Sequence, residues 1–241
     1  MAVFTATRWE FDAIQSALDA SRRLDRHTVC GHRGARTVLL TRCGIGPIRA
    51  AAACRAVLAR DRIDLVVSAG YASALRQAAV GDLLIGTMVQ GDGGEPTDCS
   101  RDAVQAAMDE ASRLEMTVIS GPFVSTSRVV CLGAEKRALA ARTGAIAVDM
   151  ESAALGAAAR QAGLPFLIVR SASDLAEEDL PLDFNLFLTP ATWLRGLAQG
   201  VRPAAWPGLR RLRSQASVAS ARLSLFFREW LSAERSAMGI R

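Results

Sequence analysis

The chain has 241 residues, half of them hydrophobic, and a formal net charge of +5 at pH 7. This length and apolar content suffice for one α/β domain, and five cysteines without C-x-x-C spacing, beside two histidines, indicate neither a disulfide framework nor a zinc site. No apolar run approaches the roughly 20 residues that cross a bilayer, so we expect a cytoplasmic protein.

The positive charge is concentrated at the C-terminal end. Residues 189–241 hold nine arginines against two glutamates, a net of +7, whereas residues 1–188 hold 20 basic and 22 acidic residues, a net of −2. We therefore predict a main domain over residues 1–188 and an Arg-rich helical tail over residues 189–241. Few aromatic residues accompany the arginines and no recognised motif is present, which argues against a nucleic-acid partner.

Apolar periodicity predicts alternating strands and helices along the main domain. We expect strands near residues 2–5, 37–41, 65–68, 82–89, 117–123, 145–148 and 166–171. We expect helices near residues 10–24, 48–60, 102–114, 134–142 and 152–161. This alternation predicts the α/β class, with a mixed or parallel sheet covered by helices on both faces.

The tail carries the pattern of one long helix. Its apolar residues are spaced alternately by three and four, which places them on one face: Leu209, Leu212, Ala216, Ala219, Leu223, Phe226 and Trp230. Arginines flank this face at positions 210, 211, 213, 222 and 228. Two interpretations stay open: the helix packs on the domain or on a second subunit, or it lies on an anionic membrane surface.

Two acidic residues follow consecutive apolar runs. Glu151 comes after the run 145–148 and begins a helical segment, and Asp174 comes after the run 166–169. If both strands are parallel, their carboxyl ends open at one edge of the sheet, and the two acids face one crevice. Each acid taken alone is also explained as a helix-start or capping residue.

The two acids belong to a longer pattern. Val148-Asp149-Met150-Glu151-Ser152-Ala153-Ala154, followed by Val169-Arg170-Ser171-Ala172-Ser173-Asp174, resembles the signature of the nucleoside phosphorylase and methylthioadenosine/S-adenosylhomocysteine nucleosidase superfamily. The glycine turn at 41–47 and the strand at 66–70 are also similar to that family. The resemblance implies a catalytic domain with a single mixed sheet flanked by helices, and a homo-oligomer. It also implies cleavage of the N-glycosidic bond of a purine nucleoside, with adenine as the preferred base, without a metal or organic cofactor.

The resemblance assigns roles around the base and the sugar. Asp174 would protonate or hydrogen-bond N7 of the purine, helped by the hydroxyls of Ser171 and Ser173. Glu151 would accept hydrogen bonds from the ribose hydroxyls, and Met150 would pack against the sugar. Contacts to the base fall to Val129 and Val130.

The nucleophile is either phosphate or water. We prefer phosphorolysis, with phosphate as co-substrate and with phosphate ligands proposed by position: Thr7, Arg8, Arg49 and Gly70. Glu10 lies where the nucleosidases carry the carboxylate that activates water, so hydrolysis is the alternative. Tyr71 departs from the family, which usually has a small or hydroxylic residue after this glycine. Its side chain would either donate to phosphate or substrate, or fill the phosphate space.

Other functions compete with this one. The Arg-rich tail is similar to the hopanoid-associated phosphorylases, which implies a lipid-linked nucleoside and peripheral membrane contact. A non-catalytic membrane-surface module is the alternative from another class. A dinucleotide-binding turn at Gly44-Ile45-Gly46 fails because Arg49 occupies the third glycine position.

Overall fold

The computed structural model describes residues 1–188, 191–200 and 203–233. Its strands are β1 (Ala2–Thr5), β2 (Ala20–Arg23), β3 (Thr28–Arg33), β4 (Arg36–Arg42), β5 (Val66–Ala74), β6 (Leu83–Gly91), β7 (Thr97–Asp98), β8 (Val118–Ser125), β9 (Ala147–Asp149) and β10 (Phe166–Asp174). Its α-helices are α1 (Arg8–Gln15), α2 (Pro47–Arg60), α3 (Arg101–Arg113), α4 (Gly133–Thr143), α5 (Ser152–Gln161), α6 (Trp193–Gly200) and α7 (Trp206–Ser232). Short 3-10 helices follow β10 and α6: η1 (Phe184–Phe187) and η2 (Pro203–Ala205).

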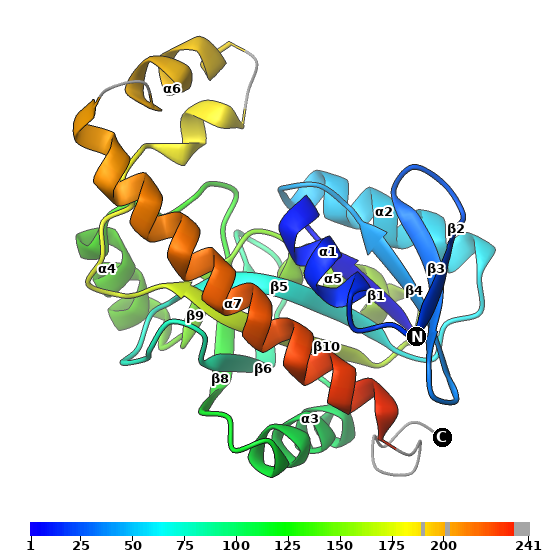
Figure 1. Ribbon diagram of the computed structural model, residues 1–241. Helices are drawn as coiled ribbons and strands as arrows, with labels where there is room; N and C mark the ends of the chain where they lie inside the picture. The colour runs from blue at the N-terminus through cyan, green and yellow to red at the C-terminus, as the bar shows by residue number, and fades with distance from the viewer. Residues whose placement is uncertain (189–190, 201–202, 234–241) are drawn as a thin grey trace.

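The strands join into one mixed sheet in the order β10-β6-β8-β9-β5-β1-β4-β3-β2, with β7 beside β6. Because β10 also pairs with β5, the strands β5, β10, β6, β8 and β9 close into a ring, from which β1, β4, β3 and β2 extend. Helices α1, α3 and α7 pack together on one side, and α2 packs with α5 on the other (Figure 1). The expected α/β fold with a mixed sheet flanked by helices is confirmed.

The direction of β9 differs from the prediction. This strand runs antiparallel to β5, whereas β10 runs parallel to β5, so β9 and β10 are not parallel to each other. Ser73, near the end of β5, nevertheless pairs with Val148 on one side and with Asp174 on the other. The strand register, and not a shared direction, therefore brings the two acidic segments together.

The first predicted helix is too long. A capping box between Thr7 and Glu10 begins α1, which ends at Gln15, and residues 20–23 form β2 in an antiparallel pair with β3. All four side chains of β2 are exposed, so the strand has no apolar alternation to mark it. Its existence depends on pairing with β3, which local periodicity does not report.

Helix α7 is part of the core of the main domain. It packs against β10, α1 and α3, and its predicted apolar face is buried from Ala216 to the C-terminal end, with Leu209 and Leu212 half-buried. Phe226 and Phe227 both contact the ring of Trp230, with ring centroids 5.7 Å apart in each pair. This face packs on the domain and is not available to a membrane.

The division of the chain after residue 188 stays a prediction. Residues 189–190, 201–202 and 234–241 of the expected tail lie outside the described residues. None of the helices in the described ranges is long and apolar enough to span a membrane.

We expect Trp230→Ala to lower the free energy of unfolding by about 3–5 kcal/mol, because it removes a large, fully buried side chain from the interface between α7 and the sheet. Urea unfolding followed by circular dichroism measures this loss. Trp206→Ala is the control, since Trp206 is 51% exposed on the same helix and its loss should change stability by no more than about 0.5 kcal/mol. Equal, small effects of both changes would contradict this account of α7.

Candidate functional site

A cavity of about 330 Å³ collects most of the predicted site residues. It lies where the β1–α1 turn, the ends of β5, β9 and β10, and the loop after β8 meet. Its lining includes nine residues proposed from the sequence: Thr7, Glu10, Tyr71, Val129, Val130, Met150, Glu151, Ser173 and Asp174.

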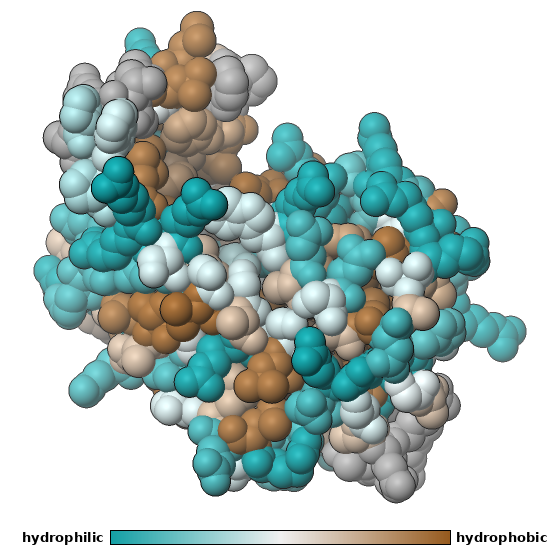
Figure 2. All heavy atoms as spheres, viewed as in Figure 1, coloured by the Kyte–Doolittle hydropathy of each residue, from teal (hydrophilic) through white to brown (hydrophobic). Residues whose placement is uncertain are grey.

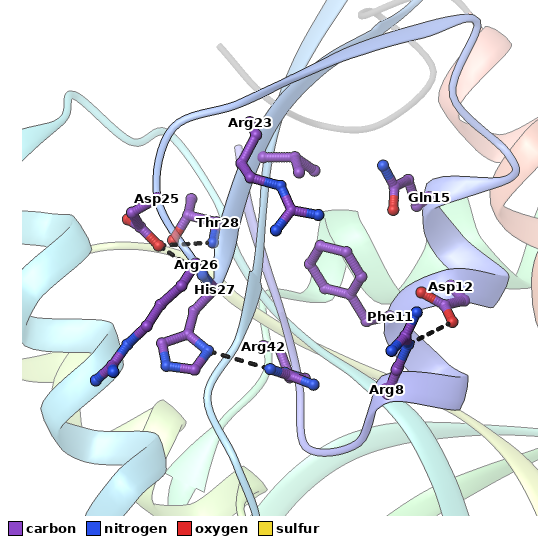
Figure 3. Close-up of a pocket in the computed structure, with 11 residues that line it drawn as sticks. Arg8, Phe11, Asp12, Gln15, Arg23, Asp25, Arg26, His27, Thr28 and Arg42 are labelled. Carbon is purple, nitrogen blue, oxygen red and sulfur yellow. Dashed lines mark hydrogen bonds and ion pairs between the residues drawn. The ribbon is translucent and has the colours of Figure 1, made fainter.

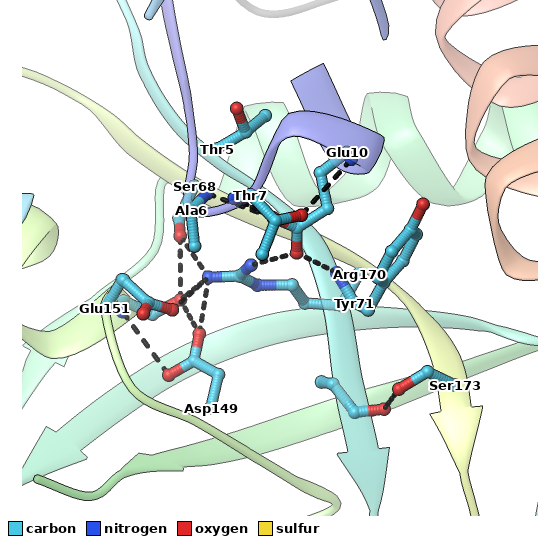
Figure 4. A network of polar contacts seen from close by, with 12 residues as sticks. Thr5, Ala6, Thr7, Glu10, Ser68, Tyr71, Asp149, Glu151, Arg170 and Ser173 are labelled. Atoms are coloured by element: carbon cyan, nitrogen blue, oxygen red, sulfur yellow. Dashed lines mark hydrogen bonds and ion pairs between the residues drawn. The ribbon is translucent and has the colours of Figure 1, made fainter. Parts of the chain in front are cut away.

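Arg170 is the centre of a buried ionic cluster beside this cavity (Figure 4). Its side chain is 1% exposed, and Nη2 donates to Asp149 Oδ2 at 2.6 Å. Glu10 Oε1 and Glu151 Oε2 each lie 3.9 Å from a guanidinium nitrogen. Among the described residues, three carboxylates thus surround one cation. Their excess of negative charge suits a reaction in which positive charge develops on the substrate.

Backbone amides hold Glu10 in place. Glu10 Oε2 accepts from the N–H of Thr7 at 2.6 Å and of Ala6 at 3.1 Å, and Oε1 accepts from the N–H of Tyr71 at 2.8 Å. Gly70 has a φ of 151°, and a Cβ atom there would lie 2.2 Å from Glu10 Oε1. Glycine is therefore required for this close approach. Gly70 leaves room for the carboxylate of Glu10, and it is not among the described residues that line the cavity.

Glu151 occupies the N-cap position of α5, where its Oε1 accepts from the backbone N–H of Gly46 at 2.8 Å. Burial raises the pKa of Glu151 to about 7, and the neighbouring Asp149 and Glu10 add to this rise, whereas Arg170 and the Gly46 amide oppose it. The glycine turn at 44–46 thus contacts the acid cluster directly, which links two segments of the family pattern.

We expect the stability of the protein to fall as the pH rises from about 4.5 towards 7, because the raised pKa of Glu151 lets the folded state keep a proton that the unfolded chain releases. The loss amounts to roughly 3 kcal/mol at about 1.4 kcal/mol per pKa unit. Glu151→Gln cannot ionise, so its stability should change less over this range. Thermal unfolding at a series of pH values tests this, and parallel curves for both proteins would contradict it.

Asp174 ends β10, and both of its carboxylate oxygens are bound. Oδ1 accepts from Ser173 Oγ at 2.9 Å, as proposed, and Oδ2 accepts from Lys136 Nζ at 2.5 Å. Ser171 was expected to help, but its buried hydroxyl has no hydrogen-bond partner among the described residues. Lys136 of α4, and not Ser171, makes the second side-chain contact to Asp174.

The residues proposed to bind phosphate are not brought together. Arg8 lines a different cavity of about 230 Å³, between α1 and the β2–β3 hairpin, and its Nε lies 3.4 Å from Asp12 (Figure 3). Arg49 is exposed on α2 and is not among the described lining residues of the acidic cavity. Thr7 does line that cavity, but its hydroxyl donates to Glu10 at 2.8 Å.

Tyr71 points away from the acid cluster, towards α7 (Figure 4). Its hydroxyl hydrogen-bonds to Ser220 of that helix, and burial raises the pKa of Tyr71 to about 12. The neutral phenol therefore borders the cavity without closing it over Glu10. The departure from the family pattern at this position is matched by a partner on the tail helix, which no local pattern could reveal.

Two features of the site were missed by the sequence analysis. One is an apolar wall contributed by the segment after β10 and by α7: Leu180, Phe184, Phe187, Leu188 and Leu212. The other is the pair of buried cations, Arg170 and Lys136. A charged residue within the apolar run of β10 was the available signal for Arg170.

The described ranges contain no group of three or more His, Cys, Asp or Glu side chains that could hold a metal ion. All five cysteines are free thiols. Burial raises the pKa of Cys43, whose Sγ donates to Thr5 O at 3.1 Å, and this agrees with a structural role for the cysteine of the glycine turn.

The chain is similar to several known proteins. A 5'-methylthioadenosine/S-adenosylhomocysteine nucleosidase of Shewanella halifaxensis is 25% identical over 182 residues, which cover 68% of this chain and 79% of the relative. The nucleosidase of Neisseria meningitidis, solved with methylthio-immucillin-A, superposes with a TM-score of 0.77 at 20% identity and covers 96% of this chain and 97% of its own. Futalosine hydrolase of Helicobacter pylori superposes with a TM-score of 0.75 at 15% identity, with 95% of each chain covered.

A family model shows which family the chain belongs to. The model of the phosphorylase superfamily matches residues 1–193, most of the chain. The chain therefore belongs, as an enzyme, to the phosphorylase superfamily.

Proposed function

We propose that this enzyme hydrolyses the N-glycosidic bond of a 5′-substituted adenine nucleoside, with water as the nucleophile. The relatives named above support this choice, since they are nucleosidases and a hydrolase. Hydrolysis was the alternative in the sequence analysis, where phosphorolysis was preferred, and it is now the proposed reaction.

The observation that carries the proposal is the position of Glu10. Its carboxylate accepts the backbone N–H groups of Ala6, Thr7 and Tyr71, which are the kind of donors that a phosphate site would need. A phosphate ion in this place would meet a carboxylate and lose those donors. Water, in contrast, gains a base held at the cavity wall.

The reaction needs charge support on both sides of the bond. Water attacks C1′ of the ribose and passes a proton to Glu10, while the C1′–N9 bond breaks and its electron pair moves into the purine. Asp174 gives a proton to N7 of the departing base. Glu151 accepts hydrogen bonds from the ribose hydroxyls, and the negative cluster around Arg170 stabilises the oxocarbenium-like sugar.

The 5′ substituent is apolar in this proposal. The wall formed by Phe184, Phe187, Leu188 and Leu212 gives it a surface on which to pack. A lipid-linked nucleoside is the extreme case of such a substrate. Leu194, Leu197 and Trp206 support that case, because these large apolar side chains are exposed on α6 and at the start of α7. Figure 2 shows hydrophobic surface over α6, with hydrophilic side chains beside the N-terminal half of α7.

Chromatography of released base tests the proposal. Methylthioadenosine, S-adenosylhomocysteine, adenosine, inosine and an adenosine with a large apolar 5′ group are each incubated with the enzyme, with and without phosphate. From methylthioadenosine and from the adenosine with a large apolar 5′ group, we expect adenine and a free sugar to form at the same rate in both conditions. Release that requires phosphate and yields a sugar 1-phosphate would restore phosphorolysis.

Membrane contact and self-association have their own tests. Flotation of the full chain with anionic liposomes at low salt reports peripheral binding, and failure to float removes the lipid-linked substrate from consideration. Because the buried face of α7 is used within the chain, such contact rests on the exposed residues of α6 and α7. A homo-oligomer stays a prediction, which light scattering of the purified protein checks.

A further inference from the structure

Lys136 is the only lysine in a chain that has 28 arginines. It lies in the first turn of α4, and its side chain is fully buried. Nζ donates to Asp174 Oδ2 at 2.5 Å, to Leu175 O at 3.0 Å and to Glu178 O at 2.9 Å. An ammonium group has three N–H donors, so the described acceptors use all of them. Lys136 is thus held in one orientation.

The carboxylate partner of Lys136 is the candidate acid, Asp174. Asp174 is the one carboxylate among the described residues within ion-pair distance of Lys136. The side chain of Glu178 turns elsewhere and accepts from Leu175 N at 3.1 Å and from Gln215 at 3.0 Å. With Ser173 bound to the other oxygen, the carboxyl group of Asp174 is fixed at the cavity wall.

Stability alone is a weak reason for this arrangement. Removing two charges from water is energetically costly, and a pair of apolar side chains of similar volume often stabilises a buried position as well or better. All other basic residues of the chain, apart from its two histidines, are arginines. The guanidinium group of arginine is planar and presents its donors in a rigid fork. The site uses a compact ammonium whose three donors reach one carboxylate and two carbonyls of the following loop.

Building on the proposed function, we propose that Lys136 is a positioning residue for base departure: it orients Asp174 towards the purine and balances the charge that Asp174 gains in the reaction. Asp174 first takes up a proton from water; when this O–H bond breaks and the proton joins N7, the electron pair stays on the carboxylate. The ammonium 2.5 Å away stabilises that anion, so the proton transfer becomes more favourable. Lys136 itself gives up no proton and contacts no substrate.

The test is a double-mutant cycle on the full chain with methylthioadenosine. Lys136→Met, Asp174→Asn and the double variant are compared with the wild type for kcat, KM and thermal unfolding. We expect Lys136→Met to lower kcat by about 10–100-fold, within the range of coupling between two residues of one ion pair, with KM nearly unchanged. In the Asp174→Asn background it should cause no further loss, because its partner is already gone.

Arg113→Met on α3 is the matched control. It also removes a cation from a buried carboxylate, that of Glu110, whose side chain is 8% exposed, but it lies outside the described lining of the cavity. It should lower stability and leave kcat unchanged. If Lys136→Met folds poorly, Lys136→Gln takes its place, since an amide keeps N–H donors for the carbonyls of Leu175 and Glu178.

The outcomes separate the two proposals. A wild-type enzyme that releases no base overturns the proposed function and this inference with it. An active wild type with a Lys136→Met variant of similar kcat overturns the inference alone. A loss that adds fully to that of Asp174→Asn, or that Arg113→Met reproduces, assigns Lys136 a purely structural role and also overturns it.

Discussion

Asp174→Asn is expected to lower kcat for adenine release by a factor of about 10²–10⁴, the usual contribution of a general acid. The amide cannot give a proton to N7, but it is close to isosteric and still offers an oxygen to Lys136 or to Ser173. Folding should therefore survive, and the loss should appear in kcat and not in the yield of folded protein. Steady-state base release and thermal unfolding measure the two effects separately.

Asp109→Asn is the control for this change. Asp109 is exposed on α3, accepts a hydrogen bond from Gln105 at 2.7 Å, and lies outside the described lining of the cavity. Its substitution should leave kcat unchanged. Near-normal turnover in Asp174→Asn would remove Asp174 from the role of acid, whatever the control shows.

Glu10→Gln should abolish most turnover as well, by a factor of about 10²–10⁴, because the amide cannot take a proton from water. One side of the amide must also face a backbone N–H that now lacks an acceptor, at Thr7 or at Tyr71, which costs about 1–3 kcal/mol of stability. Kinetics with and without phosphate decide between the two nucleophiles. A hydrolase stays inactive in both conditions, whereas a phosphorylase would regain turnover when phosphate is added.

Asp12→Asn tests whether α1 itself is disturbed. Asp12 is exposed on the same helix and pairs with Arg8 at 3.4 Å, so its substitution should have little effect on turnover. Equal losses in Glu10→Gln and Asp12→Asn would point to the helix and not to the carboxylate of Glu10.

Glu151 and Asp174 could be proposed because each follows an apolar run, whereas Glu10 was proposed from the resemblance to the nucleosidases. Glu10 completes a capping box, Glu151 precedes α5, and Asp174 ends β10, and all three line one cavity. The cations could not be assigned in this way. Arg170 binds Asp149 across 21 positions, and Lys136 binds Asp174 across 38. Such pairs depend on strand register and helix packing, which no local motif reports.

The fold shows the same division. Helices α2 and α5 were predicted nearly to the residue, and the buried face of α7 was predicted from apolar residues that repeat every three or four positions. The extension of α1 to residue 24 was wrong, because β2 has four exposed side chains and exists through its pairing with β3. A strand of this kind carries no apolar signal of its own.

By itself the sequence determined the α/β class and the amphipathic face of the last helix, because both follow from local spacing, and its resemblance to a known family suggested the site residues. The tertiary structure decided which partners these residues meet. In it, β9 pairs antiparallel with β5 and α7 packs on the domain. Tyr71 hydrogen-bonds to Ser220, and Lys136 donates to Asp174. These contacts join segments far apart in the chain, and their geometry follows from the packing of the whole core, not from any one segment.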